Sequence, residues 1–513
     1  MNKLITPLVA FMLSFAFALP ALSQQEAVFS KKGAIHDQVI EAWKSQFRSY
    51  YNTEIQKRLF GDGDVYVLYD VQIGGLQAFV EMTRRCKDVG QIAEIADLLM
   101  PVFSALKPIP GSNNSSGWIC SGGKICTAYG FIGKEVPLCS VQFLGLLGAL
   151  ATSISENIPA PQQTTELKTF VKAAFNTMAV QLDRWLTSGY FSSLDKRLQA
   201  TVTDVKDKKS AYYFTDLDLW YLTVLSDLSE LHQWGVQAAT EDGITAFESL
   251  QNKKDTIHKI FDLFLARSFR SKSRNGTRAE IDRGFWKYHF DNRYACYTDT
   301  LPPVSWEPDN KGGWQMKTAV PWDSAYLARD AGWDISHARR LVPALETFVR
   351  NQGNIKKVWG YSNPAFDPVA IRKAYANQIV EKLWNGNLRF PLFSNLWSGD
   401  NGWYRVAYAN QTGRQFAGYP PYGLTSSIPD GGYVVWGAFD PTLHTIFRNI
   451  FELSNTNEAE AKLFMAQYYS GLSSGTAKKS INRFSFLSDM VELPLLSTGK
   501  RQNLNASGIV THQ

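Results

Sequence analysis

Apolar residues recur at helical spacing along most of this chain. The segment 138–154 is the most apolar of these patterns and carries little charge, so we expect a helix that is buried on most sides. Segments with a helical pattern alternate with polar loops, and no alternation of strand and helix is visible, so the pattern predicts an all-α chain. The expected helices span 35–51, 89–106 with an interruption at Pro101, 138–154, 164–186, 215–234, 244–269, 368–384, 441–453 and 457–470.

Three long segments between these helices are rich in glycine, aromatic and polar residues. They span 109–136, 284–322 and 388–431. Helices of about 15 to 25 residues joined by unequal loops suit a ring of helical hairpins, in which loops at one end build a cleft. We therefore expect an (α/α) toroid, either incomplete or with six hairpins, that forms a single domain over residues 24–496. We expect 497–513 to be a disordered tail.

The stretch 321–350 joins this helical pattern to a polar, aromatic segment. Gly332 is expected to break the stretch into two helices, and Asp334 is placed to cap the second one. His337 then falls in the first turn of a helix whose apolar positions face the core, and Pro343 is expected to kink this helix. Those positions are Leu341, Val342, Leu345 and Val349.

The first 23 residues have the pattern of a secretory signal. Lys3 precedes an apolar run over 8–19, and Ala21-Leu22-Ser23 fits a cleavage site of small residues. No other apolar run approaches the ~20 residues that a membrane-spanning helix requires. We therefore expect an exported protein, secreted or periplasmic, with no integral membrane segment after the signal is removed.

The composition narrows the choice of partner. Aromatic residues make up 13% of the chain, with 15 Trp and 22 Tyr, and flat rings offer sugars a stacking surface, although they also pack between helices. The formal charge of +6 is mild, and no long basic run of the kind expected for nucleic-acid binding occurs.

The five cysteines permit disulfides in an exported protein. Cys120 and Cys126 flank a short loop that can close on itself, and Cys86 and Cys139 are candidates for a second bridge, which leaves Cys296 free. The spacing contains no CxxC pair, so we do not expect a zinc site. We also expect no other metal and no cofactor.

Two short motifs resemble a known architecture. They are Trp333-Asp334-Ile335-Ser336-His337-Ala338, which opens an inner-helix pattern, and Gly399-Asp400-Asn401-Gly402-Trp403-Tyr404-Arg405, which has the character of a cleft-lining loop. With the export signal and the number of helices, they resemble the (α/α) toroids of secreted polysaccharide lyases and related glycan-active proteins. The resemblance is architectural and covers most of residues 31–490.

His337 is the first candidate for catalysis. The positive end of a helix dipole disfavours an imidazolium, so the ring stays neutral and able to accept a proton. Asp334 either caps the helix or orients the ring, and Arg340 can bind a carboxylate of the substrate. A capped helix start with a hydrogen-bonded histidine is the plainer interpretation.

Two further groups are candidates for the same surface. Tyr288 and His289 lie in an aromatic segment, where only one of them can face a cleft if the segment is extended. In the loop after Asp400, Tyr404 is a candidate acid for the departing glycosidic oxygen. The expected substrate-binding residues are Arg340, Asn401, Arg405, Trp403, Tyr288, His289 and Trp333.

These features favour an exported enzyme acting on poly- or oligosaccharides. The leading hypothesis is a polysaccharide lyase that performs β-elimination on a uronate-containing glycan, with His337 as base and Tyr404 as acid. One alternative is a glycoside hydrolase that uses two carboxyl groups, and another is a non-catalytic protein that binds glycans or the cell envelope. The candidate acids for hydrolysis are Glu307, Asp323, Asp330, Asp334, Asp400, Asp430 and Asp440.

Overall fold

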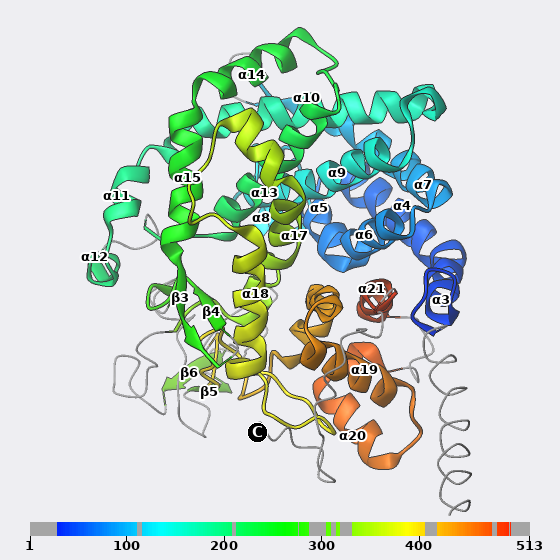
Figure 1. Cartoon of the computed structure of the whole chain (residues 1–513), viewed down its shortest axis with the longest axis vertical. Coiled ribbons are helices and arrows are strands. Elements are labelled where there is room, and N and C mark those ends of the chain that lie inside the picture. Colours follow the sequence, from blue (N-terminus) through cyan, green and yellow to red (C-terminus); the bar gives the residue numbers. More distant parts are fainter. Residues whose placement is uncertain are drawn as a thin grey trace, which may run out of the picture.

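The computed structural model describes residues 28–109, 115–207, 212–274, 276–286, 304–308, 314–318, 331–405, 418–473, 480–491 and 493. Within these residues the chain is predominantly helical, and its strands form short two-stranded antiparallel ribbons (Figure 1). The prediction of an all-α chain is therefore confirmed. The predicted signal sequence and tail lie outside the described residues, and so do Tyr288, His289, Cys296, Asp323 and Asp330.

The N-terminal part consists of consecutive helices joined by π-helical turns. Its elements are α3 (Ala34–Ala42), η1 (Trp43–Phe47), α4 (Arg48–Glu54), η2 (Ile55–Asp62), α5 (Tyr66–Val71), η3 (Gln72–Leu76), α6 (Gln77–Cys86), α7 (Val89–Leu99) and η4 (Met100–Ala105). Gly75 has a φ of 100°, a conformation that favours glycine, and it breaks the helical path between α5 and α6. The expected interruption at Pro101 is confirmed, because this residue lies at the start of the 3-10 turn η4.

A long apolar helix, α9 (Pro137–Asn157), lies inside the protein. All of its residues from Cys139 to Ser155 are buried, which confirms the expected burial. By length and hydropathy α9 could cross a membrane, so the expectation that no other segment reaches that length was wrong. However, 94% of its most apolar window is buried in the protein, and the helices α10 (Thr165–Thr187) and α13 (Asp216–Gln233) pack against it.

The segment 244–269 departs from its predicted single helix. It contains most of α14 (Glu241–Asn252), then α15 (Lys254–Arg267), and then the start of strand β3 (Ser268–Ser273). This strand pairs antiparallel with β4 (Gly276–Ile281). In β3 the exposed side chains of Arg270 and Lys272 alternate with the half-buried side chains of Ser271 and Ser273. The remaining small elements of this region are β1 (Lys107–Pro108), β2 (Ser116–Gly117), α8 (Lys124–Ala128), η5 (Ala160–Gln162), η6 (Gly189–Phe191), α11 (Leu194–Gln199), α12 (Val202–Asp207), β5 (Val304–Pro308) and β6 (Trp314–Thr318).

The helix after His337 runs without the expected kink. A short helix, α16 (Ile335–Ala338), is followed by α17 (Leu341–Asn354), which continues through Pro343. This proline occupies the first turn, where a backbone N–H has no partner within the helix, so nothing is lost. The chain then continues through η8 (Ile355–Trp359), α18 (Pro368–Gln378) and η9 (Ile379–Leu383).

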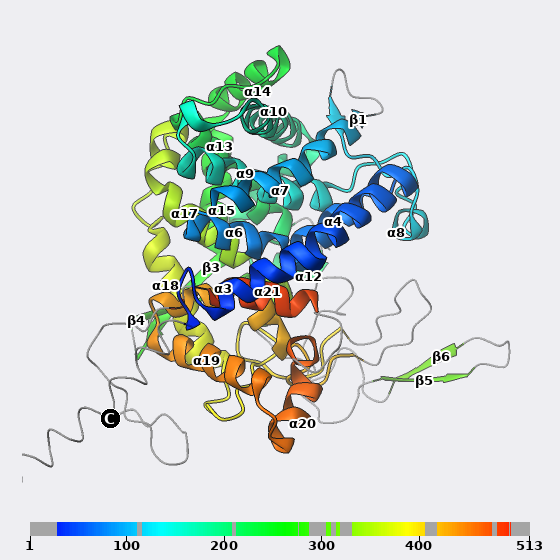
Figure 2. The ribbon, with the colours of Figure 1, turned by 90° about the vertical axis from the view of Figure 1, so that its right-hand side faces the viewer.

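The C-terminal part returns to the first helices of the chain. It comprises η10 (Thr425–Ser427), η11 (Pro429–Gly431), η12 (Tyr433–Ala438), α19 (Pro441–Asn455), α20 (Ala459–Tyr468), η13 (Ser470–Leu472) and α21 (Ile481–Met490). Helix α21 packs against α3 and α6, as Figures 1 and 2 show from two directions. One hydrophobic core extends from Phe29 to Leu493.

Of the two predicted disulfides, one is confirmed and one is wrong. The predicted disulfide between Cys120 and Cys126 is confirmed. The proposed bridge between Cys86 and Cys139 is wrong, because both are free thiols. Arg84, close to Cys86, contacts the carbonyl oxygen of Ala149, which is ten residues, or about 15 Å of helix, beyond Cys139.

Candidate functional site

Asp334 organises the start of α16. Its Oδ1 accepts hydrogen bonds from the backbone amides of Ser336 (3.0 Å) and His337 (3.1 Å), and also from the Ser336 hydroxyl. Its Oδ2 lies 2.5 Å from Nδ1 of His337. Asp334 therefore has both of the roles that the sequence suggested. Its Oδ1 caps the helix, and its Oδ2 orients the histidine ring.

Tyr404 reaches the same carboxylate from a distant loop. Its hydroxyl donates to Asp334 Oδ2 at 2.5 Å. The two segments are aligned by backbone hydrogen bonds from Ile335 N to Asn395 O (3.0 Å) and from Trp397 N to Trp333 O (2.7 Å). The structure thus brings together Asp334, His337, Tyr404 and the following Arg405, which we call the Asp–His cluster.

The charges in the Asp–His cluster are set by burial and by neighbouring groups. Burial alone would raise the pKa of Asp334, but its interaction with His337 and the charge of Arg405 hold that pKa well below the usual range. Burial lowers the pKa of His337, and Arg405 and Arg340 lower it further, although Asp334 opposes them. The cluster therefore pairs an ionised carboxylate with a neutral imidazole at neutral pH.

This geometry defines the tautomer of His337. With Asp334 ionised, Nδ1 must carry the proton that it shares with Oδ2, so Nε2 is the basic atom. Asp334 is fully buried, whereas the His337 side chain is 16% exposed, and its ring meets the edge of Trp286 at 5.2 Å. An oriented, neutral and partly exposed histidine has the chemistry of a general base.

Tyr404 does not fit the role of a general acid that the sequence suggested. It is fully buried, and its single hydroxyl proton is committed to Asp334. Trp333 is also fully buried, with Nε1 donating to the Phe214 carbonyl oxygen at 3.2 Å, so it cannot stack on a sugar. Both residues position the cluster instead.

Two expected carboxylate-binding residues also have internal partners. Arg340 is 6% exposed; it donates to the Tyr69 hydroxyl at 2.8 Å and lies 3.4 Å from an oxygen of Asp216. Asn401 accepts backbone hydrogen bonds from Asn395 (3.3 Å) and Tyr422 (2.7 Å), and so holds its loop together. Neither arrangement is that of an open binding group.

Arg405 and Trp403 are the other two expected substrate-binding residues of this loop. Both are partly buried, and Arg405 lies close enough to alter the pKa of both Asp334 and His337. Its φ of 53° is unusual for a residue with a side chain. The expected contributions of Tyr288 and His289 lie outside the described residues, although Trp286, two residues earlier than Tyr288, contacts the His337 ring.

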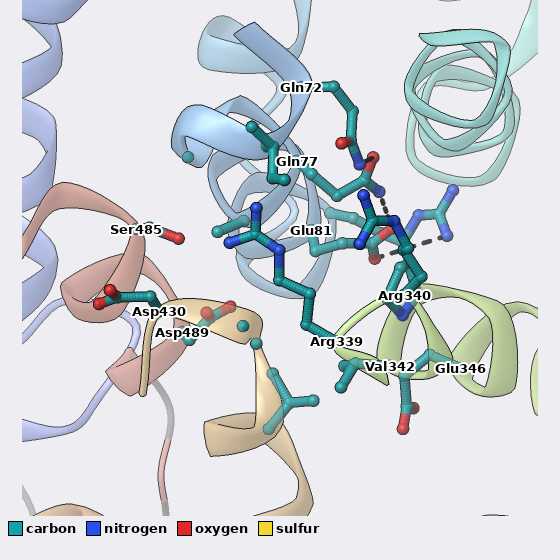
Figure 3. A pocket seen from close by; sticks show the side chains of 18 of the residues that line it. Gln72, Gln77, Glu81, Arg339, Arg340, Val342, Glu346, Asp430, Ser485 and Asp489 are labelled. Atoms are coloured by element: carbon teal, nitrogen blue, oxygen red, sulfur yellow. Dashed lines mark hydrogen bonds and ion pairs between the residues drawn. The ribbon is translucent and has the colours of Figure 1, made fainter. Parts of the chain in front are cut away.

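A cavity that the sequence did not indicate lies beside this cluster. It has a volume of about 520 Å³ and lies between α6, α17, α21 and the turn from η11 to η12 (Figure 3). We call it the arginine cavity, after six lining residues: Arg84, Arg85, Arg339, Arg340, Arg350 and Arg372. Arg340 joins it to the Asp–His cluster, because its guanidinium also donates to the carbonyl oxygens of Ser336 and His337.

The fold and the site together define a helical protein with an oriented aspartate–histidine pair beside a charged cavity. No protein-family model, no curated protein and no solved structure matches this chain. Among the described residues, no three or more His, Cys, Asp or Glu side chains are grouped so as to hold a metal ion.

Proposed function

We propose that this protein is an exported carbohydrate-active enzyme that cleaves a uronate-containing glycan by β-elimination. The observation that carries the proposal is the contact of 2.5 Å between Asp334 Oδ2 and His337 Nδ1, which presents a neutral imidazole as a base. We further propose that the helices close into an (α/α) toroid. Support for this comes from the packing of α21 against α3 and α6, as a closed ring of hairpins requires.

In the proposed reaction, Nε2 of His337 removes the proton at C5 of the uronate. The C5–H electron pair forms the C4–C5 double bond, the bond between C4 and the glycosidic oxygen breaks, and that oxygen takes a proton from the imidazolium. Arg405 offsets the carboxylate charge that makes the C5 proton acidic. Asp334 holds the ring and stabilises its charged form, as an aspartate does for a catalytic histidine elsewhere.

The test is an assay of the mature chain with a panel of uronate polymers. Elimination creates a conjugated double bond, so the ultraviolet absorbance rises as chains are cut. His337→Ala is expected to lower the rate by about 10²- to 10⁴-fold, the usual contribution of a general base.

A matched control is His258→Ala. His258 is also partly buried and also hydrogen-bonded, but its partner is the carbonyl oxygen of Trp359 at 2.8 Å and not a carboxylate. This variant should retain full activity. Full activity in His337→Ala would remove His337 from the mechanism.

A glycoside hydrolase is the second candidate, and one observation favours it. Asp430, among the acids expected for hydrolysis, and Asp489 both line the arginine cavity, and burial raises the pKa of each to about 7. A carboxyl group that is protonated near neutral pH can act as a general acid. Hydrolysis would release reducing ends without any rise in absorbance, and Asp430→Asn would abolish it.

A further inference from the structure

Two of the six arginines that line the arginine cavity form no ion pair with a carboxylate of the described residues, although carboxylates lie near both. Of its six arginines, four form ion pairs with carboxylates: Arg84 with Glu81 and Glu156, Arg340 with Asp216, Arg350 with Asp227 and Glu230, and Arg372 with Glu346. Arg85 and Arg339 have no such partner among the described residues. Arg85 does donate to the carbonyl oxygen of Ser488 at 3.1 Å.

Arg339 is the more exceptional of the two. Its guanidinium makes no hydrogen bond or ion pair with the described part of the chain, and its Nε is buried. Figure 3 shows its side chain extending into the cavity, with Asp430 and Asp489 on one side and Glu81 on the other. Burial lowers the pKa of Arg339 to about 10, so it remains a cation at neutral pH.

The backbone is adapted to hold Arg339 in this place. A Cβ atom on Gly431 would lie 2.7 Å from Cβ of Arg339, so only glycine lets the turn approach the arginine so closely. The same turn carries Asp430. A partly buried charge without a partner destabilises a fold, and such local conflicts are typical of positions kept for binding.

Unsatisfied acceptors face the same space. Oδ1 of Asp430 and Oδ2 of Asp489 are buried and have no hydrogen-bond partner in the described residues, and Asp489 is only 4% exposed. The other oxygen of Asp430 accepts from Asn482 at 3.0 Å. A ligand that completes the cavity must therefore supply both an anion for Arg339 and hydroxyl donors for the two aspartates.

We propose that the arginine cavity binds a sugar acid of monosaccharide size, with its carboxylate on Arg339 and its hydroxyl groups on Asp430 and Asp489. The volume of about 520 Å³ falls within the roughly 300–1,000 Å³ of small-molecule sites. A neutral sugar would supply no anion to form an ion pair with Arg339. Inorganic phosphate would put its charge beside two aspartates without satisfying them as several sugar hydroxyls can.

This inference goes beyond the proposed cleavage reaction, because it concerns equilibrium binding of a small ligand. The test is isothermal titration of the mature full-length chain with glucuronate and galacturonate, and with glucose, acetate and inorganic phosphate for comparison. At least one uronate should bind with one-to-one stoichiometry and at least about tenfold more tightly than the other three compounds. Absence of uronate binding, or equal binding of glucose, would overturn the proposal.

Variants of Arg339 separate binding from folding. Arg339→Gln should weaken uronate binding at least about tenfold, whereas Arg339→Lys should retain part of it. The glutamine variant should melt no lower than the unmodified protein without ligand, since it removes a charge that has no partner. A fall in melting temperature would show that Arg339 serves the fold, and unchanged binding would remove it from the site.

Arg389→Gln is the control. This arginine is largely exposed and paired with Glu460 on the surface, so uronate binding should not change. Loss of polymer cleavage in His337→Ala with intact uronate binding would support both proposals separately. Cleavage by a protein that binds no uronate in the cavity would reject the cavity site alone.

Discussion

Asp334 and Arg339 lie five residues apart in the sequence, but they differ in whether the protein itself supplies partners for the charged group. Every oxygen of Asp334 is satisfied, by Ser336, His337 and Tyr404. Arg339 carries its charge into a cavity and makes no hydrogen bond or ion pair with the described part of the chain. The difference separates two kinds of site, because a satisfied pair holds a reactive group in place, whereas an unsatisfied group gains its partner from a ligand.

The largest expected effect comes from Asp334→Asn, which removes the carboxylate whose oxygens are all hydrogen-bonded. An amide cannot hold the Nδ1–H tautomer of His337 and accept from Tyr404 as a carboxylate does, so the cleavage rate should fall by about 10²- to 10⁴-fold. The absorbance assay measures it. Asp367→Asn is the control, because Asp367 caps α18 through the Ala370 amide and asparagine caps equally well. Equal rates for the two variants would contradict the assignment.

The next largest effect is on stability, and it compares Arg350 with Arg339, which line the same cavity. Arg350 contacts Asp227 at 2.6 Å and Glu230 at 2.8 Å, so Arg350→Gln leaves two buried carboxylates unpaired and should destabilise the protein by about 3–5 kcal/mol. Arg339→Gln should not destabilise it. Chemical denaturation monitored by tryptophan fluorescence measures both. A similar loss in the two variants would mean that Arg339 has a structural partner after all.

Tyr404→Phe tests whether the buried hydroxyl positions or reacts. Loss of one hydrogen bond to the Asp334 carboxylate should lower stability by about 1–3 kcal/mol. As a positioning residue, Tyr404 should affect the rate by only about tenfold and shift the acidic limb of the pH–rate profile, which depends on His337. A loss as great as that in His337→Ala, with the pH profile unchanged, would restore Tyr404 as the acid.

The smallest expected effect is a pH dependence of stability that arises from Asp489 in the arginine cavity. Burial raises the pKa of Asp489 to about 7, Glu81 raises it as well, and Arg85 opposes them, whereas an unfolded aspartate titrates near about 3.9. Between these values the folded state binds more protons, so stability falls as pH rises from about 4 to about 7.

Asp489→Asn should remove this contribution. The melting temperature of the variant relative to the unmodified protein should therefore increase from about pH 5 to about pH 8. A difference that stays constant over this range would contradict the raised pKa.

Local interactions made much of this protein predictable from its sequence. The helical pattern, the cap at Asp334, the placement of His337 in the first turn and the disulfide between Cys120 and Cys126 each depend on residues that are close in the chain. The strand after Arg267 was missed, because its pairing with β4 and not its own pattern decides its conformation.

Only the tertiary structure decided what the site residues do. Tyr404 and Trp333 are of residue types that often line a binding surface, yet both side chains are buried by segments distant in sequence. Arg339 and Arg340 are adjacent and alike in sequence, but Arg340 meets Tyr69 and Asp216 whereas Arg339 meets an open cavity. Periodicity and capping act over a few residues, but burial and charge pairing depend on which distant elements pack together.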